Sequence, residues 1–215
     1  GFWQCIRAAD FDGDGDTDLV AGNLGSNNKF KKTPDTHLKM WVKDFDNNKG
    51  LEQVLAYNVD EDWYPVAFKD ELGKRIPSII NKRFTDYKSF AGKTISEVFK
   101  DEELRGAQLL EVDKFESVYL ENKSGGGVVQ VLPNAAQVSK LFALTVADIN
   151  GDGKPDILGG GNFLGVSMYQ GRYDSSDGLI LVNDGRGNFQ SRSAVDSGFL
   201  LDGEIRGIRQ VKGAK

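Results

Sequence analysis

Most of the chain consists of short apolar runs separated by turns rich in Gly, Asp and Asn. The run 179–183, for example, is followed by Asp184–Gly185–Arg186–Gly187 and then by Phe189. Asn-Asp-Gly between apolar runs predicts a β-hairpin, because these residues tolerate a positive φ. A similar hairpin is predicted over 118–128, in which Asn122 corresponds to Asn183. The 26 glycines against 5 prolines likewise favour a mainly β protein with many tight turns.

One segment, from about Lys69 to Gly106, departs from this pattern. Its apolar residues follow a helical spacing, and Pro77 predicts a kink or a late helix start. Thr94 and Glu97 have the spacing of a capping box. We interpret the segment as a helical insertion between β units. Its apolar face either packs on a sheet edge or binds a partner.

An Asp-rich stretch occurs twice, and Asp148 of the later copy corresponds to Asp10 of the earlier one. Residues 8–20 and 146–158 align at every Asp, Asn and Gly of the pattern D-x-[DN]-x-D-G-x-x-D, and a Gly-rich step follows each copy. A weaker copy lies at 44–52, with Asp44 in the position of Asp10. We call these stretches the first loop (10–18), the second loop (148–156) and the third loop (44–52).

The spacing of carboxylates in these loops predicts calcium binding. Oxygen ligands at alternate positions can surround one ion, and Ca²⁺ takes six to eight hard oxygens at about 2.3–2.6 Å. Without a cation the clustered carboxylates would repel each other. Magnesium demands a tighter octahedral geometry, and zinc favours Cys or His ligands. An EF-hand is excluded, since position twelve is Ala21 in the first copy and Gly159 in the second.

The predicted ligands follow from the positions in each loop. In the first loop they are the side chains of Asp10, Asp12, Asp14 and Asp18 with the carbonyl of Asp16. In the second loop they are the side chains of Asp148, Asn150, Asp152 and Asp156 with the carbonyl of Lys154.

The third loop departs from the motif at two positions. Lys49 replaces the glycine and Glu52 replaces the last aspartate. Two interpretations remain open: an intact metal site, or a degenerate hairpin held by Asx-type hydrogen bonds. The candidate ligands are Asp44, Asp46, Asn48 and Glu52.

Charge and composition narrow the function classes. The net charge of −5 gives no support for nucleic-acid binding. The single cysteine, Cys5, cannot form an intrachain disulfide and fits a buried apolar position. No run of about 18 apolar residues is present, so we expect no membrane-spanning segment, and no signal peptide is visible.

The sequence offers few residues suited to catalysis. We therefore expect that the protein is not an enzyme, and we assign no catalytic residue. His37 is the only histidine, and we interpret it as a surface residue at a strand start. No Ser/His/Asp or Cys/His set can be assembled. Two interpretations remain for the aromatic residues near the loops, which either pack between β units or stack on a ligand. They are Trp41, Trp63, Tyr64, Tyr169 and Tyr173.

The Asp-rich loops, followed by short apolar strands and a Gly-Asn step, resemble FG-GAP/VCBS repeats, which build the propeller of integrin α chains. Residues 8–24, 70–72 and 171–174 together resemble the large VCBS proteins of the UnbV and cartilage-acidic-protein type. The resemblance implies about three β-propeller-like blades of a larger propeller, stabilised by Ca²⁺. It implies an extracellular, cell-surface or periplasmic location and a protein or glycan partner. The alternative function is the non-catalytic portion of a polysaccharide-degrading lyase or hydrolase.

The pattern also predicts an organisation of the chain. Residues 1–68 are expected to form a β repeat unit with two Asp-rich loops, and 69–113 the helical insertion. Residues 114–202 are expected to form β repeat units with one Asp-rich loop. Residues 203–215 resemble the first strand of a truncated further repeat, so we expect the parent chain to be longer.

Overall fold

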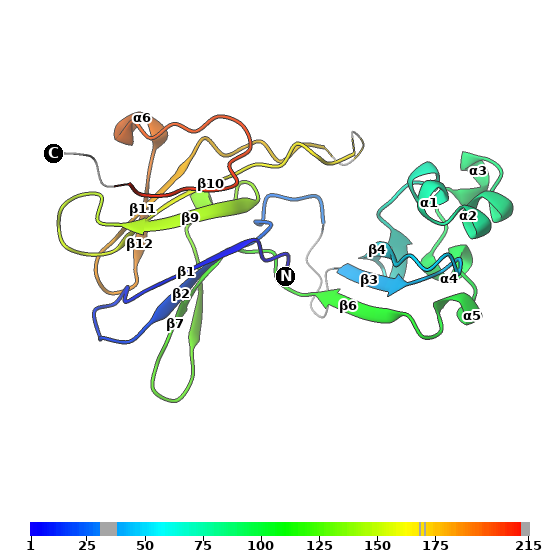
Figure 1. Ribbon diagram of the computed structural model, residues 1–215, viewed down its shortest axis with the longest axis horizontal. Helices are drawn as coiled ribbons and strands as arrows, with labels where there is room; N and C mark the ends of the chain where they lie inside the picture. Colours follow the sequence, from blue (N-terminus) through cyan, green and yellow to red (C-terminus); the bar gives the residue numbers. More distant parts are fainter. Residues whose placement is uncertain (31–37, 168, 170, 212–215) are drawn as a thin grey trace. The chain divides into compact units, whose positions relative to one another are not determined.

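The computed structural model describes residues 1–30, 38–167, 169 and 171–211 and has a mainly β fold (Figure 1). Three four-stranded antiparallel sheets are present within these residues. The chain divides into two compact units. We call Gly1–Asn28 with Phe115–Lys215 the two-sheet unit, and Lys29–Lys114 the helical unit.

The two-sheet unit contains two sheets whose strands each follow one another in a simple antiparallel order. The first sheet has the order β1 (Cys5–Ala9), β2 (Asp18–Gly22), β7 (Val118–Glu121) and β8 (Val128–Val131). The second has the order β9 (Leu141–Ala147), β10 (Asp156–Gly161), β11 (Leu179–Asn183) and β12 (Phe189–Arg192). The predicted hairpins over 118–128 and 179–189 are confirmed as β7–β8 and β11–β12.

The two sheets share one register. Leu19 of β2 pairs with Leu120 of β7, and Ile157 of β10 pairs with Leu181 of β11. In the alignment of the sequence repeats, Leu19 corresponds to Ile157 and Leu120 corresponds to Leu181. The same pair of repeat positions is therefore matched in both sheets. The helical unit is inserted in sequence between β2 and β7, which nevertheless pair directly.

The core of the two-sheet unit is built from the inward residues of both sheets. Phe11 packs edge-to-face on Tyr119 and on Phe189, with ring centroids 5.8 and 5.5 Å apart. Buried aliphatic side chains complete the core, among them Val20, Leu144, Ile157, Leu179 and Leu181. A 3₁₀ turn (Asn134–Ala136) and the short helix α6 (Ala194–Ser197) complete the elements described in this unit.

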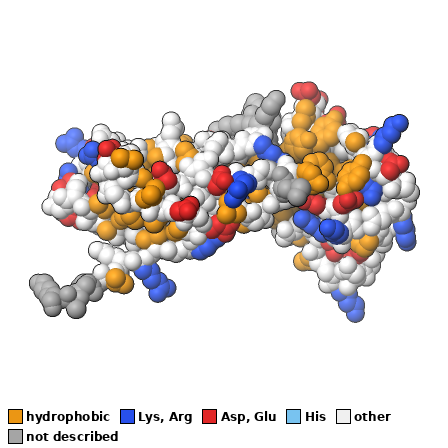
Figure 2. Space-filling view, turned by 90° about the horizontal axis from the view of Figure 1, so that it is seen from above, with side chains coloured by type: hydrophobic (Ala, Val, Ile, Leu, Met, Phe, Trp, Pro, Cys, Tyr) orange, Lys and Arg blue, Asp and Glu red, His pale blue; other side chains and the backbone are white. Residues whose placement is uncertain are grey.

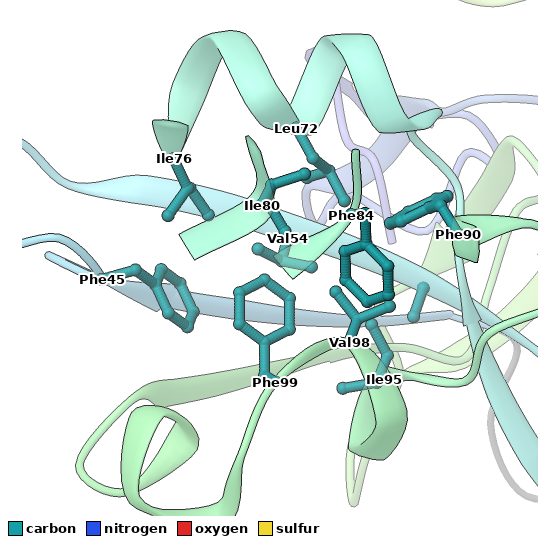
Figure 3. Close-up of a cluster of buried hydrophobic side chains, with 11 residues drawn as sticks. Phe45, Val54, Leu72, Ile76, Ile80, Phe84, Phe90, Ile95, Val98 and Phe99 are labelled. Carbon is teal, nitrogen blue, oxygen red and sulfur yellow. The ribbon is translucent and has the colours of Figure 1, made fainter. Parts of the chain in front are cut away.

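The helical unit combines the third sheet with five short helices. The sheet has the order β5 (Asp62–Pro65), β4 (Glu52–Val59), β3 (Leu38–Lys43) and β6 (Gln108–Val112). The helices are α1 (Lys69–Arg75), α2 (Pro77–Arg83), α3 (Tyr87–Phe90), α4 (Ile95–Val98) and α5 (Asp101–Leu104). Figure 3 shows side chains of the helices meeting Phe45 and Val54 in one apolar cluster. The apolar face of the helical segment is therefore buried within its own unit.

Local signals explain the helix boundaries. Pro77 is the first residue of α2, so the predicted interruption is confirmed as a break between α1 and α2. The amide of Thr94 donates a hydrogen bond to the Glu97 carboxylate, 2.8 Å away, and the predicted capping box at the start of α4 is confirmed.

The predicted repeat boundaries at residues 68, 113 and 202 stay a prediction. Residues 203–211 form no strand, although the amide of Ile205 donates to the carbonyl of Gly161 over 2.8 Å. Among the described residues, none of the helices has the length and apolar character needed to cross a membrane. On the face shown in Figure 2, acidic and basic side chains are interspersed with apolar ones.

Candidate metal centres

The three Asp-rich loops adopt one backbone conformation. Each connects two paired strands: β1 to β2, β9 to β10 and β3 to β4. Positions four and six of every loop have a positive φ, where a side chain normally costs about 1–2 kcal/mol. The residues are Gly13 (82°) and Gly15 (93°), Gly151 (79°) and Gly153 (81°), and Asn47 (60°) and Lys49 (71°).

The carboxylate at position one organises each turn by accepting backbone amides. Asp10 accepts from the amides of Gly13 and Gly15 over 2.7 and 3.0 Å. Asp148 accepts from the amides of Gly151 and Gly153 over 2.7 and 2.9 Å. In the third loop, Asp44 accepts from the amides of Asn48 and Lys49 over 3.0 and 2.9 Å.

The carboxylate at position nine closes each loop from the other side. Asp18 accepts from the amide of Phe11 over 3.0 Å, and Asp156 accepts from Ile149 over the same distance. Glu52 accepts from the amide of Phe45 over 2.9 Å, so its longer side chain makes the equivalent bond. The third loop therefore has the fold of the other two despite its two departures from the motif.

Asp18 and Asp156 also bind the next strand of their sheets. Both carboxylates are fully buried. The second oxygen of Asp18 accepts from the amide of Asn122 over 2.8 Å, and that of Asp156 accepts from Asn183 over 2.8 Å. The Tyr119 hydroxyl also donates to Asp18, and burial together with this bond raises the pKa of Tyr119. These two aspartates thus hold the loops on the sheets, whether or not they also touch a metal.

Acidic oxygens converge in the first loop. Asp10, Asp12 and Asp18 each offer a carboxylate oxygen within 4.8 Å of the others. The pKa of Asp12 and the pKa of Asp16 are both raised, first by burial and further by the charges of Asp14 and Asp18. Oδ1 of Asp16 is buried and has no hydrogen-bond partner. A buried carboxylate oxygen without a donor is costly, and a cation would supply the missing interaction.

The third loop has a comparable cluster. Asp44, Asp46 and Glu52 each offer an oxygen within 4.8 Å of the others. Oδ1 of Asp46 is buried and has no hydrogen-bond partner. All these ligand atoms are hard oxygens, a donor set that fits calcium and not zinc.

The second loop carries fewer negative charges. Asn150 stands where the first loop has Asp12, and Nζ of Lys154 lies 3.7 Å from the carboxylate of Asp152. The pKa of Asp152 is lowered, first by the hydrogen bond from the Lys154 amide. The loop has the same geometry, but the Lys154 ammonium neutralises part of its negative charge. A bound cation would therefore stabilise this loop less than the first one. The carbonyls of Asp16 and Lys154 stay predicted ligands.

Sequence reasoning did not single out the side chains that surround the loops. Glu121 lies beside Asp12, and Asn183 contacts both the first and the second loop. The repetition of the hairpin was a usable signal, because it aligns Asn122 with Asn183.

Two of the aromatic candidates, Trp41 and Trp63, take part in packing. Trp41 and Trp63 pack against the core of the helical unit, and the ammonium of Lys39 lies 4.5 Å from the Trp63 ring centroid. Tyr173 is half-buried, and burial raises the pKa of its hydroxyl. Tyr169 is exposed. His37 lies outside the described residues.

Comparison with known proteins gives one family match. Residues 2–35, which contain the first loop, match the FG-GAP repeat. Neither the curated proteins nor the solved structures contain a match to the chain. The match covers β1, the first loop and β2, the part of the molecule where the acidic cluster and the antiparallel hairpin were found. The chain therefore contains an FG-GAP repeat over residues 2–35.

Proposed function

We propose that the protein is a calcium-binding interaction module of the β-propeller type, in which calcium has a structural role and the chain performs no catalysis. The first and third loops are the main calcium sites, and the second loop is a weaker site of the same design. The FG-GAP match and the shared loop conformation support this proposal.

The observation that carries the proposal is the pair of buried carboxylate oxygens without partners. Oδ1 of Asp16 and Oδ1 of Asp46 lie in loops where further carboxylates converge. Folding concentrates these charges, and the raised pKa values of Asp12 and Asp16 report that the charged form is disfavoured there. A divalent cation reverses this balance, because it turns mutual repulsion into shared coordination.

Calcium would act on stability through mass action. An ion that binds only the folded loops stabilises them by about 1.4 kcal/mol per site when its concentration is ten times the dissociation constant. Extracellular calcium modules have dissociation constants of about 10⁻⁴–10⁻³ M. We propose an extracellular, cell-surface or periplasmic location, where calcium is available at such concentrations.

The two-sheet unit supports the propeller and interaction parts of the proposal. Its sheets are four-stranded meanders with the Asp-rich loop between their first and second strands, as expected of repeated blades. The first sheet also borders an apolar hollow of about 430 Å³, at which Trp3 and Ile6 are 48% and 53% exposed. Exposed apolar surface of this kind is typical of contacts with a protein partner or a further repeat.

Thermal unfolding in calcium and in EGTA tests the proposal. We expect the melting temperature to rise with calcium between about 10⁻⁴ and 10⁻² M, and to respond much less to magnesium. The double variant Asp12→Asn with Asp46→Asn should lose most of the calcium response. Equal melting temperatures of the wild-type protein in calcium and in EGTA would overturn the proposal.

A further inference from the structure

The second loop contains the pair Asn150–Gly151, the only Asn-Gly pair in the sequence. The amide carbon of an asparagine side chain can be attacked by the backbone nitrogen of the next residue, and a glycine leaves this approach open because it has no Cβ. A Cβ at Gly151 would meet no atom of another part of the chain within 4 Å, so nothing crowds the turn. Both residues are exposed, so water reaches them.

The reaction of this pair needs no reactant except water. The backbone nitrogen of Gly151 forms a bond to Cγ of Asn150 while the bond from Cγ to the side-chain nitrogen breaks. That nitrogen leaves as ammonia and takes the proton of the Gly151 amide with it. Water then opens the resulting cyclic imide. Opening at the side-chain carbonyl gives aspartate, and opening at the backbone carbonyl gives isoaspartate.

The folded turn holds both reacting groups in other bonds. The amide of Gly151 donates to Oδ1 of Asp148 over 2.7 Å, so the attacking nitrogen keeps its proton. The negative charge of Asp148 also disfavours deprotonation of this nitrogen. Oδ1 of Asn150 accepts from the amide of Asp152 over 2.9 Å, which fixes the side chain that would be attacked. The reaction therefore requires the loop to open locally.

We propose that Asn150 is a site of spontaneous deamidation whose rate is set by opening of the second loop, and whose aspartate product gives this loop the acidic pattern of the first loop. Asp12 occupies the same position in the first loop. Oδ1 of Asp12 accepts from the amide of Asp14 over 3.3 Å, as Oδ1 of Asn150 does from Asp152. An aspartate therefore fits this turn. Isoaspartate does not, because it carries the chain through Cγ and changes the spacing of the loop.

The consequence for calcium rests on the proposed calcium function, whereas the reaction itself does not. The aspartate product adds a negative charge to the loop in which the Lys154 ammonium, 3.7 Å from the Asp152 carboxylate, offsets part of the existing charge. Calcium affinity depends on the number of charged ligands, so the second loop should bind calcium more tightly after deamidation. Bound calcium should in turn keep the loop closed and slow the reaction.

Incubation of the full chain at mildly alkaline pH, followed by peptide mass spectrometry, tests the inference. Parallel samples contain calcium, EGTA or urea. We expect Asn150 to deamidate about tenfold or more faster in urea than in calcium, with an intermediate rate in EGTA. Asn48 is the internal control, because it is exposed in a loop of the same conformation but is followed by Lys49. It should react far more slowly in every sample.

Two variants sharpen the test. Asp12→Asn places the same pair in the first loop, before Gly13, whose amide donates to Asp10 over 2.7 Å. This variant should deamidate at the new site too, and the aspartate product restores the original sequence there. Asn150→Asp supplies the product of the reaction in pure form. Calcium should raise its melting temperature more than that of the original protein.

The outcomes separate this inference from the proposed function. Deamidation of Asn150 no faster than that of Asn48, or equally fast in urea and in the folded protein, would overturn the inference. If folding slows the reaction but calcium makes no difference, loop-gated deamidation holds and the proposed calcium function of the second loop fails. A folded Asn150→Asp variant with no larger calcium response would refute the tighter binding. If that variant is unfolded, the calcium response of the original protein before and after deamidation decides in the same way.

Discussion

The side-chain amide of Asn183 donates to the carbonyl oxygen of Phe11 over 2.7 Å, although the residues are 172 positions apart. Phe11 is the second residue of the first loop, and its amide donates to Asp18. The backbone amide of Asn183 donates to Asp156, the last carboxylate of the second loop. One buried asparagine thus joins both Asp-rich loops across the two sheets of their unit.

We predict that Asn183→Ala destabilises the protein by about 2–3 kcal/mol. Asn183 is 1% exposed. Its removal takes the side-chain amide donor from the carbonyl of Pro155 and leaves the carbonyl of Phe11 with the amide of Gly187, 3.3 Å away. Buried groups left without a partner cost about 1–3 kcal/mol. Urea unfolding monitored by circular dichroism measures the loss.

Asn122→Ala is the matched control, because Asn122 occupies the equivalent hairpin position but its side chain is exposed. It should cost less than about 0.5 kcal/mol. Equal losses for the two variants would show that the contact between the loops has no special weight.

A second prediction concerns Asp18, which the sequence marks as a metal ligand and the structure shows as an anchor. Asp18→Ala removes the acceptor of the Phe11 amide, the Asn122 amide and the Tyr119 hydroxyl, all in a buried site. We expect a loss of about 3 kcal/mol or more. The loss should persist in EGTA, measured by urea unfolding. A defect that disappears when calcium is absent would instead identify Asp18 as chiefly a calcium ligand.

A third prediction is that the Asp16 carboxylate lowers the stability of the protein without calcium and raises it when calcium is bound. Its pKa is raised in the folded protein, so the folded state binds more protons than the unfolded state above the ordinary value of 3.8. Without calcium, stability should therefore fall as the pH rises through this range. Asp16→Asn should raise the melting temperature in EGTA at neutral pH and reduce the gain produced by calcium.

The control for this prediction is Asp14→Asn. Asp14 belongs to the same loop, but neither of its carboxylate oxygens is both buried and without a hydrogen-bond partner. We expect a smaller rise in EGTA. A fall in melting temperature for Asp16→Asn in both conditions would contradict the repulsion argument.

A fourth prediction concerns the thiol of Cys5. Burial raises its pKa to about 11, and its Sγ donates to the carbonyl of Leu141 over 3.3 Å. The ordinary value is 9.0, so at pH 8 the thiolate fraction is lower by about two powers of ten. Iodoacetamide should therefore modify the folded protein about a hundredfold more slowly than the protein in urea. Rapid modification at pH 8 would show that the thiol is freely exposed.

How far the sequence predicts this molecule depends on the range of the interactions. The hairpins at 118–128 and 179–189, the break at Pro77 and the capping box at Thr94 follow from residues within a few positions, and all are confirmed. The pairing of Lys39 with Glu111 in β3 and β6 brings together distant segments, and no local pattern signals it. The approach of Glu121 to Asp12 likewise depends on a strand register that only the folded sheet determines.

The last prediction concerns Lys49, where the sequence pattern left the third loop open. Lys49 has φ of 71°, and its amide donates to Asp44 just as a glycine amide does in the other loops. A left-handed conformation costs a residue with a side chain about 1–2 kcal/mol, and glycine avoids this cost. Glycine also makes the unfolded chain more flexible, which offsets about 0.4–1 kcal/mol of the gain. Lys49→Gly should therefore stabilise the protein by about 0.5–1 kcal/mol in urea unfolding. It should also tighten calcium binding, because a positive charge leaves the loop.

Asn47→Gly is the control and should stabilise the protein less, since asparagine tolerates its φ of 60° better than lysine does. Destabilisation by Lys49→Gly would mean that the lysine side chain, and not the turn, holds the third loop in place.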